Sequence, residues 1–139
     1  SARNQFAGTV TAVRSGAVND EVELTLAGGT RIVAIVTRDS TESLGLRTNM
    51  AAFALVKASS ILIATGLDGT RVSARNQLTG TVASVTPGLV NAEVVIALRG
   101  GTTIAATITQ ASLKALGLTP GAAATALFKA SSVILGVLV

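Results

Sequence analysis

The sequence is an internal duplication. When residues 1–67 are aligned with residues 73–139 without a gap, 33 of the 67 aligned positions are identical. A repeat of this quality means that each copy folds as the same structural unit, so it limits the architecture before any other feature does. We therefore predict two domains, at residues 1–67 and 73–139, joined by a linker at about residues 65–72.

Each repeat is rich in residues that favour strands. Residues 21–26 alternate polar and apolar side chains with a period of two, which is typical of a half-buried strand. Further runs of Val, Ile, Thr and Ala, separated by Gly, Ser and Asn, occur at residues 8–14, 30–37, 50–57 and 60–64.

One helix is expected in each repeat, after the third strand. It begins at Thr37 or Thr109 as N-cap, and it ends at Gly45 or Gly117. Five short strands with one brief helix predict an all-β fold of two tandem OB-like five-stranded Greek-key barrels.

The composition favours an oligomer. Hydrophobic residues make up 49% of the chain and charged residues 13%, against about 25% charged in a typical soluble domain. A barrel of this size also buries too little surface to be stable alone. No signal peptide opens the sequence and no apolar run is long enough to span a membrane. We predict a cytoplasmic homo-oligomer with no membrane partner.

Catalytic residue types are scarce. The sequence has no His and no Cys, so the usual general base and thiolate ligands are missing. Among the acids, only the pair Glu21 and Glu93 occupies equivalent positions in the two repeats. Paired-carboxylate catalysis needs two acids at one site, and no phosphate-binding glycine motif occurs. We therefore expect neither enzymatic activity nor a bare metal cation.

Hydrogen-bond donors recur in both repeats at the same spacing. Thr37 and Ser40 lie at the N-cap and third position of the predicted helix, where unpaired N–H groups attract anions. Lys57 precedes Ala-Ser at a strand end, and arginine contributes a planar fork of donors. Each group alone also fits a structural role, such as a helix cap or a polar strand entry. Their joint repetition, with a net charge of +4, favours a site for a small tetrahedral oxyanion.

These residues resemble the molbindin (Mop) family. Its motifs Ser-Ala-Arg-Asn, Gly-Ala-Val-Asn-x-Glu-Val, Leu-Gly-Leu and Lys-Ala-Ser occur in the first repeat at residues 1–4, 16–22, 44–46 and 57–59, and in the second with Leu89 replacing the alanine. The tandem copies are similar to the di-Mop molbindins, which store molybdate. The resemblance implies a trimer of two-barrel chains that holds molybdate or tungstate at barrel interfaces, without an organic cofactor.

The resemblance also implies which residues bind the oxyanion. One half-site consists of Ser1 and Arg3, or of Ser73 and Arg75. The other comes from a neighbouring barrel and consists of Thr37, Ser40, Lys57, Ala58 and Ser59, or of Thr109, Ser112, Lys129, Ala130 and Ser131. A second kind of site near the three-fold axis uses Val18 and Asn19, or Val90 and Asn91.

Storage and homeostasis of molybdate or tungstate is the function that we expect. One alternative is the molybdate-sensing domain of a transcriptional regulator. The chain begins at Ser1 and no helix-turn-helix segment precedes it, which fits a trimmed storage protein and the excised sensor half of a regulator equally well. Storage is favoured because both repeats keep every donor. A nucleic-acid-binding OB-fold would use aromatic stacking platforms, and the chain has three Phe and no Tyr or Trp. A purely structural module would leave the duplicated Arg and Lys without a role.

Overall fold

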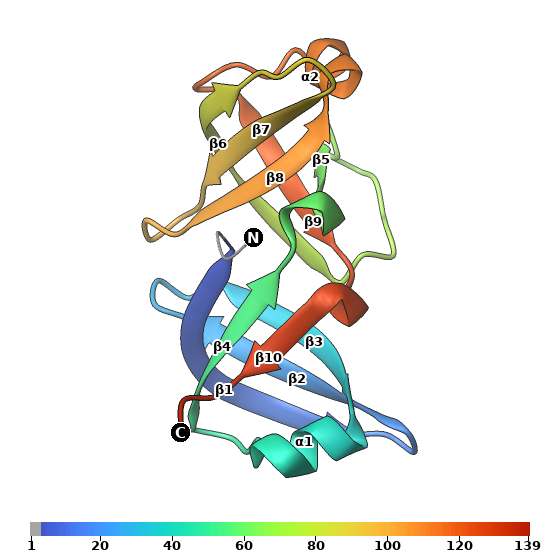
Figure 1. Cartoon of the computed structure of the whole chain (residues 1–139), viewed down its shortest axis with the longest axis vertical. Helices are drawn as coiled ribbons and strands as arrows, with labels where there is room; N and C mark the ends of the chain where they lie inside the picture. The colour runs from blue at the N-terminus through green and yellow to red at the C-terminus, as the bar shows by residue number, and fades with distance from the viewer. Residues whose placement is uncertain (1–3) are drawn as a thin grey trace.

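The computed structural model describes residues 4–139 and contains two five-stranded antiparallel sheets, one above the other (Figure 1). The first sheet has the order β10-β4-β1-β2-β3 and consists of β1 (Gln5–Ser15), β2 (Asn19–Leu26), β3 (Arg31–Thr37), β4 (Ala51–Val56) and β10 (Val133–Gly136). The second has the order β5-β9-β6-β7-β8 and consists of β6 (Asn76–Thr86), β7 (Asn91–Ala97), β8 (Thr103–Thr109), β9 (Ala123–Phe128) and β5 (Leu62–Ala64). The outer strands β3 and β10 contact each other, as do β5 and β8, so each sheet closes into a barrel. The predicted all-β fold of two tandem barrels is confirmed.

The last strand of each repeat belongs to the barrel of the other repeat. β5 pairs with β9, with Ile63 opposite Ala126, and β10 pairs with β4, with Leu135 opposite Ala54. A 3-10 turn precedes each exchanged strand, η1 (Ala58–Ser60) and η2 (Ala130–Ser132). The two repeats predicted at 1–67 and 73–139 are thus not the same residue sets as the two barrels. The sequence hides this exchange, because residues 61–64 and 133–136 are similar apolar segments that suit either barrel.

Side chains along each strand alternate between the barrel interior and the outer face, and one face of the strand forms the interior. On β2, Val22, Leu24 and Leu26 are buried, whereas the side chains between them are half-buried on the outer face. β1 bends at an irregularity between Val10 and Ala12. Near this bend a β-carbon added to Gly8 would lie 2.5 Å from the carbonyl oxygen of Thr25. A side chain there would push β2 away, so glycine permits the curvature that closes the barrel.

The predicted helices are confirmed at both ends. α1 (Arg38–Leu44) follows β3, and its N-cap Thr37 accepts the N–H of Ser40 at 3.1 Å. α2 (Gln110–Leu116) follows β8 with the same cap from Thr109. Gly45 ends α1 with a φ of 64°, a left-handed conformation that glycine adopts without strain.

Two asparagines join the barrels. The side chain of Asn76 accepts the N–H of Val33 and donates to its carbonyl, both at 2.8 Å. Asn4 forms the same pair of bonds with Ala105, at 2.8 and 2.7 Å. Each side-chain amide therefore behaves like one residue of an added strand, and it covers an edge of the other barrel that would otherwise be unpaired.

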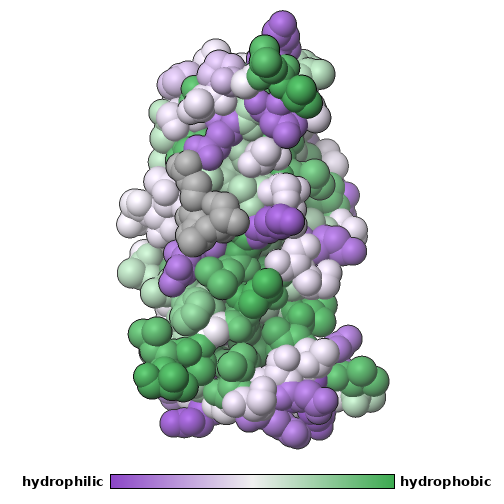
Figure 2. Space-filling model, viewed as in Figure 1, coloured by the Kyte–Doolittle hydropathy of each residue, from purple (hydrophilic) through white to green (hydrophobic). Residues whose placement is uncertain are grey.

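Apolar side chains also remain on the outside. Figure 2 shows them gathered over β4, β10 and the chain end on the face in view. Ile134 and Leu138 are 65% and 92% exposed, and Leu62 of β5 is 65% exposed. No helix among residues 4–139 is long and apolar enough to cross a membrane.

Candidate functional site

The hydroxyls predicted to bind the oxyanion form one arrangement, present twice. Thr37 donates its hydroxyl hydrogen to Ser40 Oγ at 2.9 Å, and Thr109 does the same to Ser112 at 2.9 Å. These hydrogen bonds hold the two hydroxyls of each pair together at the start of α1 and of α2. The Ser40 and Ser112 hydroxyls each accept one hydrogen bond there and retain a hydrogen to donate.

The Lys-Ala-Ser segments lie where β4 and β9 end. Ala58 and Ala130 are buried, whereas Lys57, Ser59 and their counterparts are exposed. η1 packs against β8 of the second barrel, and η2 packs against β3 of the first. Strand exchange therefore carries each Lys-Ala-Ser segment to the other repeat.

A pocket of about 350 Å³ shows the result of this exchange. Its polar lining combines Ser59 of the first repeat with Asn91, Thr107, Thr109 and Ser112 of the second. The resemblance had grouped Ser59 with Thr37 and Ser40 of its own repeat, but α1 lies at the opposite end of the molecule from β5 and α2 (Figure 1). Within one chain, the exchange of β5 therefore places Ser59 beside Thr109 and Ser112 rather than beside Thr37 and Ser40.

The chemistry of this pocket suits an oxyanion. Its polar groups are hydroxyls and one side-chain amide, and none of its described lining residues is a carboxylate. Apolar side chains, among them Ile61, Ile63 and Leu116, form the remaining wall. A pocket of about 370 Å³ beside the linker contains the carboxylate of Asp68 in its lining. Because that carboxylate repels an anion, this pocket is a poorer place for one.

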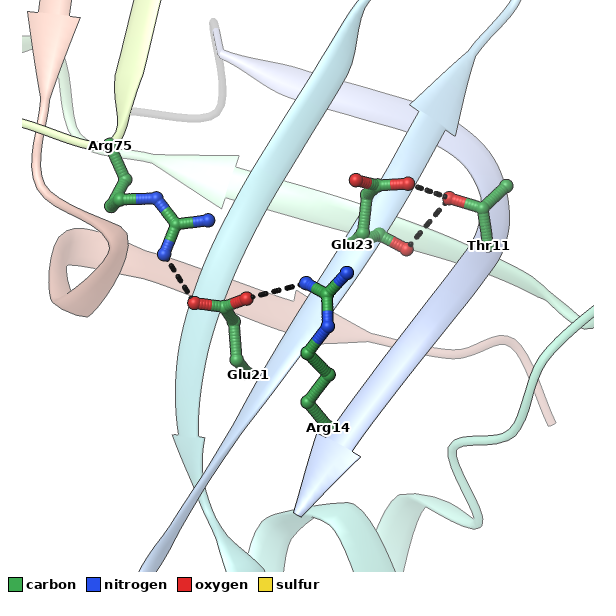
Figure 3. Close-up of polar contacts among 5 residues, drawn as sticks. All are labelled: Thr11, Arg14, Glu21, Glu23 and Arg75. Carbon is green, nitrogen blue, oxygen red and sulfur yellow. Dashed lines mark hydrogen bonds and ion pairs between the residues drawn. The ribbon is translucent and has the colours of Figure 1, made fainter. Parts of the chain in front are cut away.

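Arg75 lies elsewhere, on the outer face of the first barrel. Figure 3 shows its guanidinium donating to Glu21 of β2, whose other carboxylate oxygen accepts from Arg14 at 2.9 Å. The Arg75 hydrogen bond is the main reason that the pKa of Glu21 lies below its ordinary value; Arg14 lowers it further, and burial opposes both. Arg75 thus joins the opening of the second repeat to the first barrel.

The remaining predicted residues do not lie together. Ser1 and Arg3 lie outside the described residues, and Ser73 is exposed. Val18 and Val90 are 72% and 73% exposed at the hairpin tips. Asn19 lies opposite Thr37, and Asn91 lies opposite Thr109. Asn91 therefore belongs to the same pocket as Thr109 and Ser112.

Two interacting acids on β2 of the first barrel were not predicted as functional residues. Glu21 was noticed only as the one acid that both repeats share, and that signal could have identified it as a partner of a shared cation. Asp20 is buried; it accepts the N–H of Gly16 at 3.2 Å and lies 3.5 Å from Arg38. The second repeat has Ala92 and Gln110 at these positions, so no comparison between repeats could have revealed that pair.

No group of three or more acidic, His or Cys side chains suited to a metal ion occurs in the described part of the chain.

Comparison with known proteins shows similarity to proteins that bind or transport molybdenum compounds. The TOBE domain model matches residues 1–63 and 72–135. The chain is 50% identical to the molybdenum-pterin-binding protein MopA of Rhodobacter capsulatus, over 96% of this chain and 50% of MopA. It is 48% identical to the molybdenum transport protein ModE of Azotobacter vinelandii, over 99% of this chain and 50% of ModE. The chain therefore spans about half the length of these curated relatives.

The fold is also that of a solved structure. A crystal structure described as the cytoplasmic molybdate-binding protein ModG with molybdate bound superposes with a TM-score of 0.96 at 51% identity. The match covers 99% of this chain and 98% of ModG. The correspondence thus includes both barrels and the strands that they exchange.

Proposed function

Since the chain belongs to the TOBE-domain family and carries two copies of the domain, we propose that it binds molybdate or tungstate in pockets built from both of its repeats. The similarity to molybdate-binding relatives confirms the resemblance to the Mop family. The observation that carries the proposal is the pocket that combines Ser59 with Thr109 and Ser112. Its hydroxyl donors match the acceptor oxygens of a tetrahedral dianion.

By the symmetry of the duplication, a second pocket of the same kind combines Ser131 with Thr37 and Ser40. Support comes from η2, which packs against β3, and from the cap hydrogen bonds at Thr37, which repeat those at Thr109. Lys57 and Lys129 lie two residues from the pocket serines, and each contributes a positive charge at its pocket. Arg3 and Arg75 complete the set of cations.

We further propose that copies of the chain assemble, as a trimer, through their exposed apolar surface. The apolar surface over β4, β10 and the chain end supports this (Figure 2), because contiguous apolar surface on a soluble protein commonly marks an interface. Light scattering at micromolar concentration tests it: we expect the mass of three chains with and without molybdate. A monodisperse monomer would contradict it.

Storage in the cytoplasm remains the physiological role that we favour, and the similarity to the cytoplasmic protein ModG supports it. The sensing half of a regulator is the second candidate, because the chain is also 37% identical to the DNA-binding transcriptional dual regulator ModE of Escherichia coli over 52% of that protein. Both roles use the same anion pockets. The lack of enzymatic activity stays a prediction.

Calorimetric titration tests the binding function. Molybdate, tungstate, sulfate, phosphate and a single-stranded oligonucleotide would each be titrated into the same protein. We expect binding of molybdate and tungstate and little binding of phosphate, since a protonated phosphate oxygen finds no carboxylate acceptor among the described lining residues. Equal binding of phosphate, or binding of the oligonucleotide alone, would contradict the proposal.

A further inference from the structure

Glu21 holds two arginines from different repeats. Its Oε1 accepts a hydrogen bond from Nη1 of Arg75, and its Oε2 accepts from Nη1 of Arg14 at 2.9 Å (Figure 3). The Glu21 side chain is 23% exposed, while those of Arg75 and Arg14 are 51% and 68% exposed. The carboxylate is therefore the fixed centre of the group, and the longer side chains converge on it.

The main chain beside Arg75 is fixed to the same hairpin. Asn76, which is 2% exposed, pairs with both backbone groups of Val33 on β3. Arg75 and Asn76 thus attach to neighbouring strands of the first barrel, one through a charged side chain and the other through an amide. The opening of the second repeat has little freedom to move relative to this barrel.

The Glu21 contact brings Arg75 close to predicted oxyanion ligands. Glu21 and Asn19 are two residues apart on β2, so their side chains lie on the same outer face. Asn19 lies opposite Thr37, and two residues along a strand correspond to about 7 Å. The contacts to Glu21 use Nη1 of Arg75 alone, and a guanidinium has further N–H donors.

We propose that Glu21 is a positioning residue: it holds Arg75 on the outer face of β2 so that the remaining guanidinium N–H groups are directed to an oxyanion beside Thr37 and Ser40. This inference rests on the proposed function. An unrestrained arginine loses much rotamer freedom when it binds, and a partner that fixes it beforehand reduces that cost. Arg14 offsets the negative charge that Glu21 would otherwise present to a dianion.

The test compares Glu21→Ala and Glu21→Gln with the matched control Glu23→Ala. Glu23 is the next outward-facing residue of β2, and it accepts a hydrogen bond from Thr11 at 2.8 Å rather than from an arginine (Figure 3). Molybdate is titrated calorimetrically into each variant of the 139-residue chain, after thermal unfolding has verified that the variant is folded. The same substitutions are repeated in an Arg75→Ala background.

In Glu21→Ala, we expect the sites that contain Arg75 to weaken roughly two- to tenfold, the lower part of the range of coupling between contacting residues. The equivalent sites beside Thr109 and Ser112 should keep their affinity, so the isotherm separates into two classes, which a general loss of stability would not produce. Glu21→Gln should weaken binding less, because its amide oxygen still accepts from Arg75. Glu23→Ala should match the wild type, and in the Arg75→Ala background Glu21→Ala should have no further effect.

Tighter binding by Glu21→Ala would overturn the inference, because it would show that Glu21 competes with the anion for Arg75. Equal affinities in Glu21→Ala and Glu23→Ala would overturn it as well. If Glu21→Ala does not fold, the order of affinities between Glu21→Gln and the wild type decides the same question. Failure of the wild type to bind molybdate would instead contradict the proposed function.

Discussion

Gly28 and Gly100 touch each other where the β2–β3 hairpin of one barrel meets the β7–β8 hairpin of the other. A β-carbon built on either glycine would lie 3.0 Å from the α-carbon of its counterpart. Both glycines have positive φ, 95° and 88°. The duplication thus places two equivalent turns in direct backbone contact, near the axis that relates the repeats.

This contact predicts that Gly28→Ala costs more stability than Gly29→Ala. Gly29 has nearly the same φ, 91°, but nothing lies within 4 Å of its added β-carbon. Alanine at either position is strained by the positive φ, which costs about 1–3 kcal/mol of stability. At Gly28 the alanine side chain also pushes the two hairpins apart. We expect roughly 1 kcal/mol or more of additional loss in the free energy of unfolding, measured by urea denaturation. Equal losses would show that the hairpins separate freely.

Strand exchange predicts which barrel a C-terminal substitution damages. Leu135 is 7% exposed and pairs with Ala54 in the first barrel. Leu135→Ala should cost about 2–5 kcal/mol and should accelerate hydrogen exchange at β4, which is more than 75 residues away in the sequence. Ile63→Ala is the matched variant and should act on β9 instead. Faster exchange at β9 in Leu135→Ala, with β4 unchanged, would contradict the exchanged topology.

Asn76 predicts an unusual response to pH. Asn76→Ala leaves both backbone groups of Val33 without their partner, at about 1–3 kcal/mol for each. Asn76→Asp keeps an acceptor for the N–H but, when ionised, loses the donor to the carbonyl. Protonation restores that donor, so the pKa of the new carboxyl should rise on folding. The deficit of Asn76→Asp relative to the wild type should then shrink as the pH falls. A deficit independent of pH in denaturant titrations would rule out this geometry.

The contribution of Asp20 to stability has the opposite pH dependence, because it is lost as the pH falls. The Thr41 side chain first, and then the Gly16 N–H and Arg38, hold its pKa below 3.8, while burial opposes them. A lowered folded-state pKa stabilises the protein above the unfolded-state value, and that contribution disappears as the pH falls through the folded-state pKa. Asp20→Asn should therefore reduce the loss of stability below about pH 4. Exposed Asp39→Asn serves as control, and equal acid sensitivity of Asp20→Asn and the wild type would contradict the assignment.

Pairs of serine substitutions distinguish the two possible groupings of the site. Ser59→Ala with Ser112→Ala damages one pocket twice, so the other pocket should keep its wild-type molybdate affinity. Ser59→Ala with Ser40→Ala damages both pockets, so no site of wild-type affinity should remain. Calorimetric titration counts the undamaged sites. The reverse pattern would indicate that each pocket takes its hydroxyls from a single repeat.

The local structure could be predicted from the sequence because local residues determine it. Thr37 and Gly45 mark the helix ends through their own hydrogen bonds and φ, and the alternation along residues 21–26 reflects one buried face. The partner of each final strand could not be predicted, because residues 61–64 and 133–136 offer either barrel a similar apolar segment. The donors of the site could be predicted because they recur in both repeats. Which donors share a pocket could not be predicted, because that depends on the strand exchange. The role of Glu21 could not be inferred from the sequence, because its contact with Arg75 is visible only in the structure.

The central claim is that an oxyanion binds where the two repeats meet. The most direct measurement is an anomalous difference map at the molybdenum absorption edge, from a crystal of this chain grown with molybdate. The account predicts a peak between Ser59, Thr109 and Ser112, and an equivalent peak between Ser131, Thr37 and Ser40. Ordered molybdenum elsewhere on the chain, with both of these pockets empty, would contradict it.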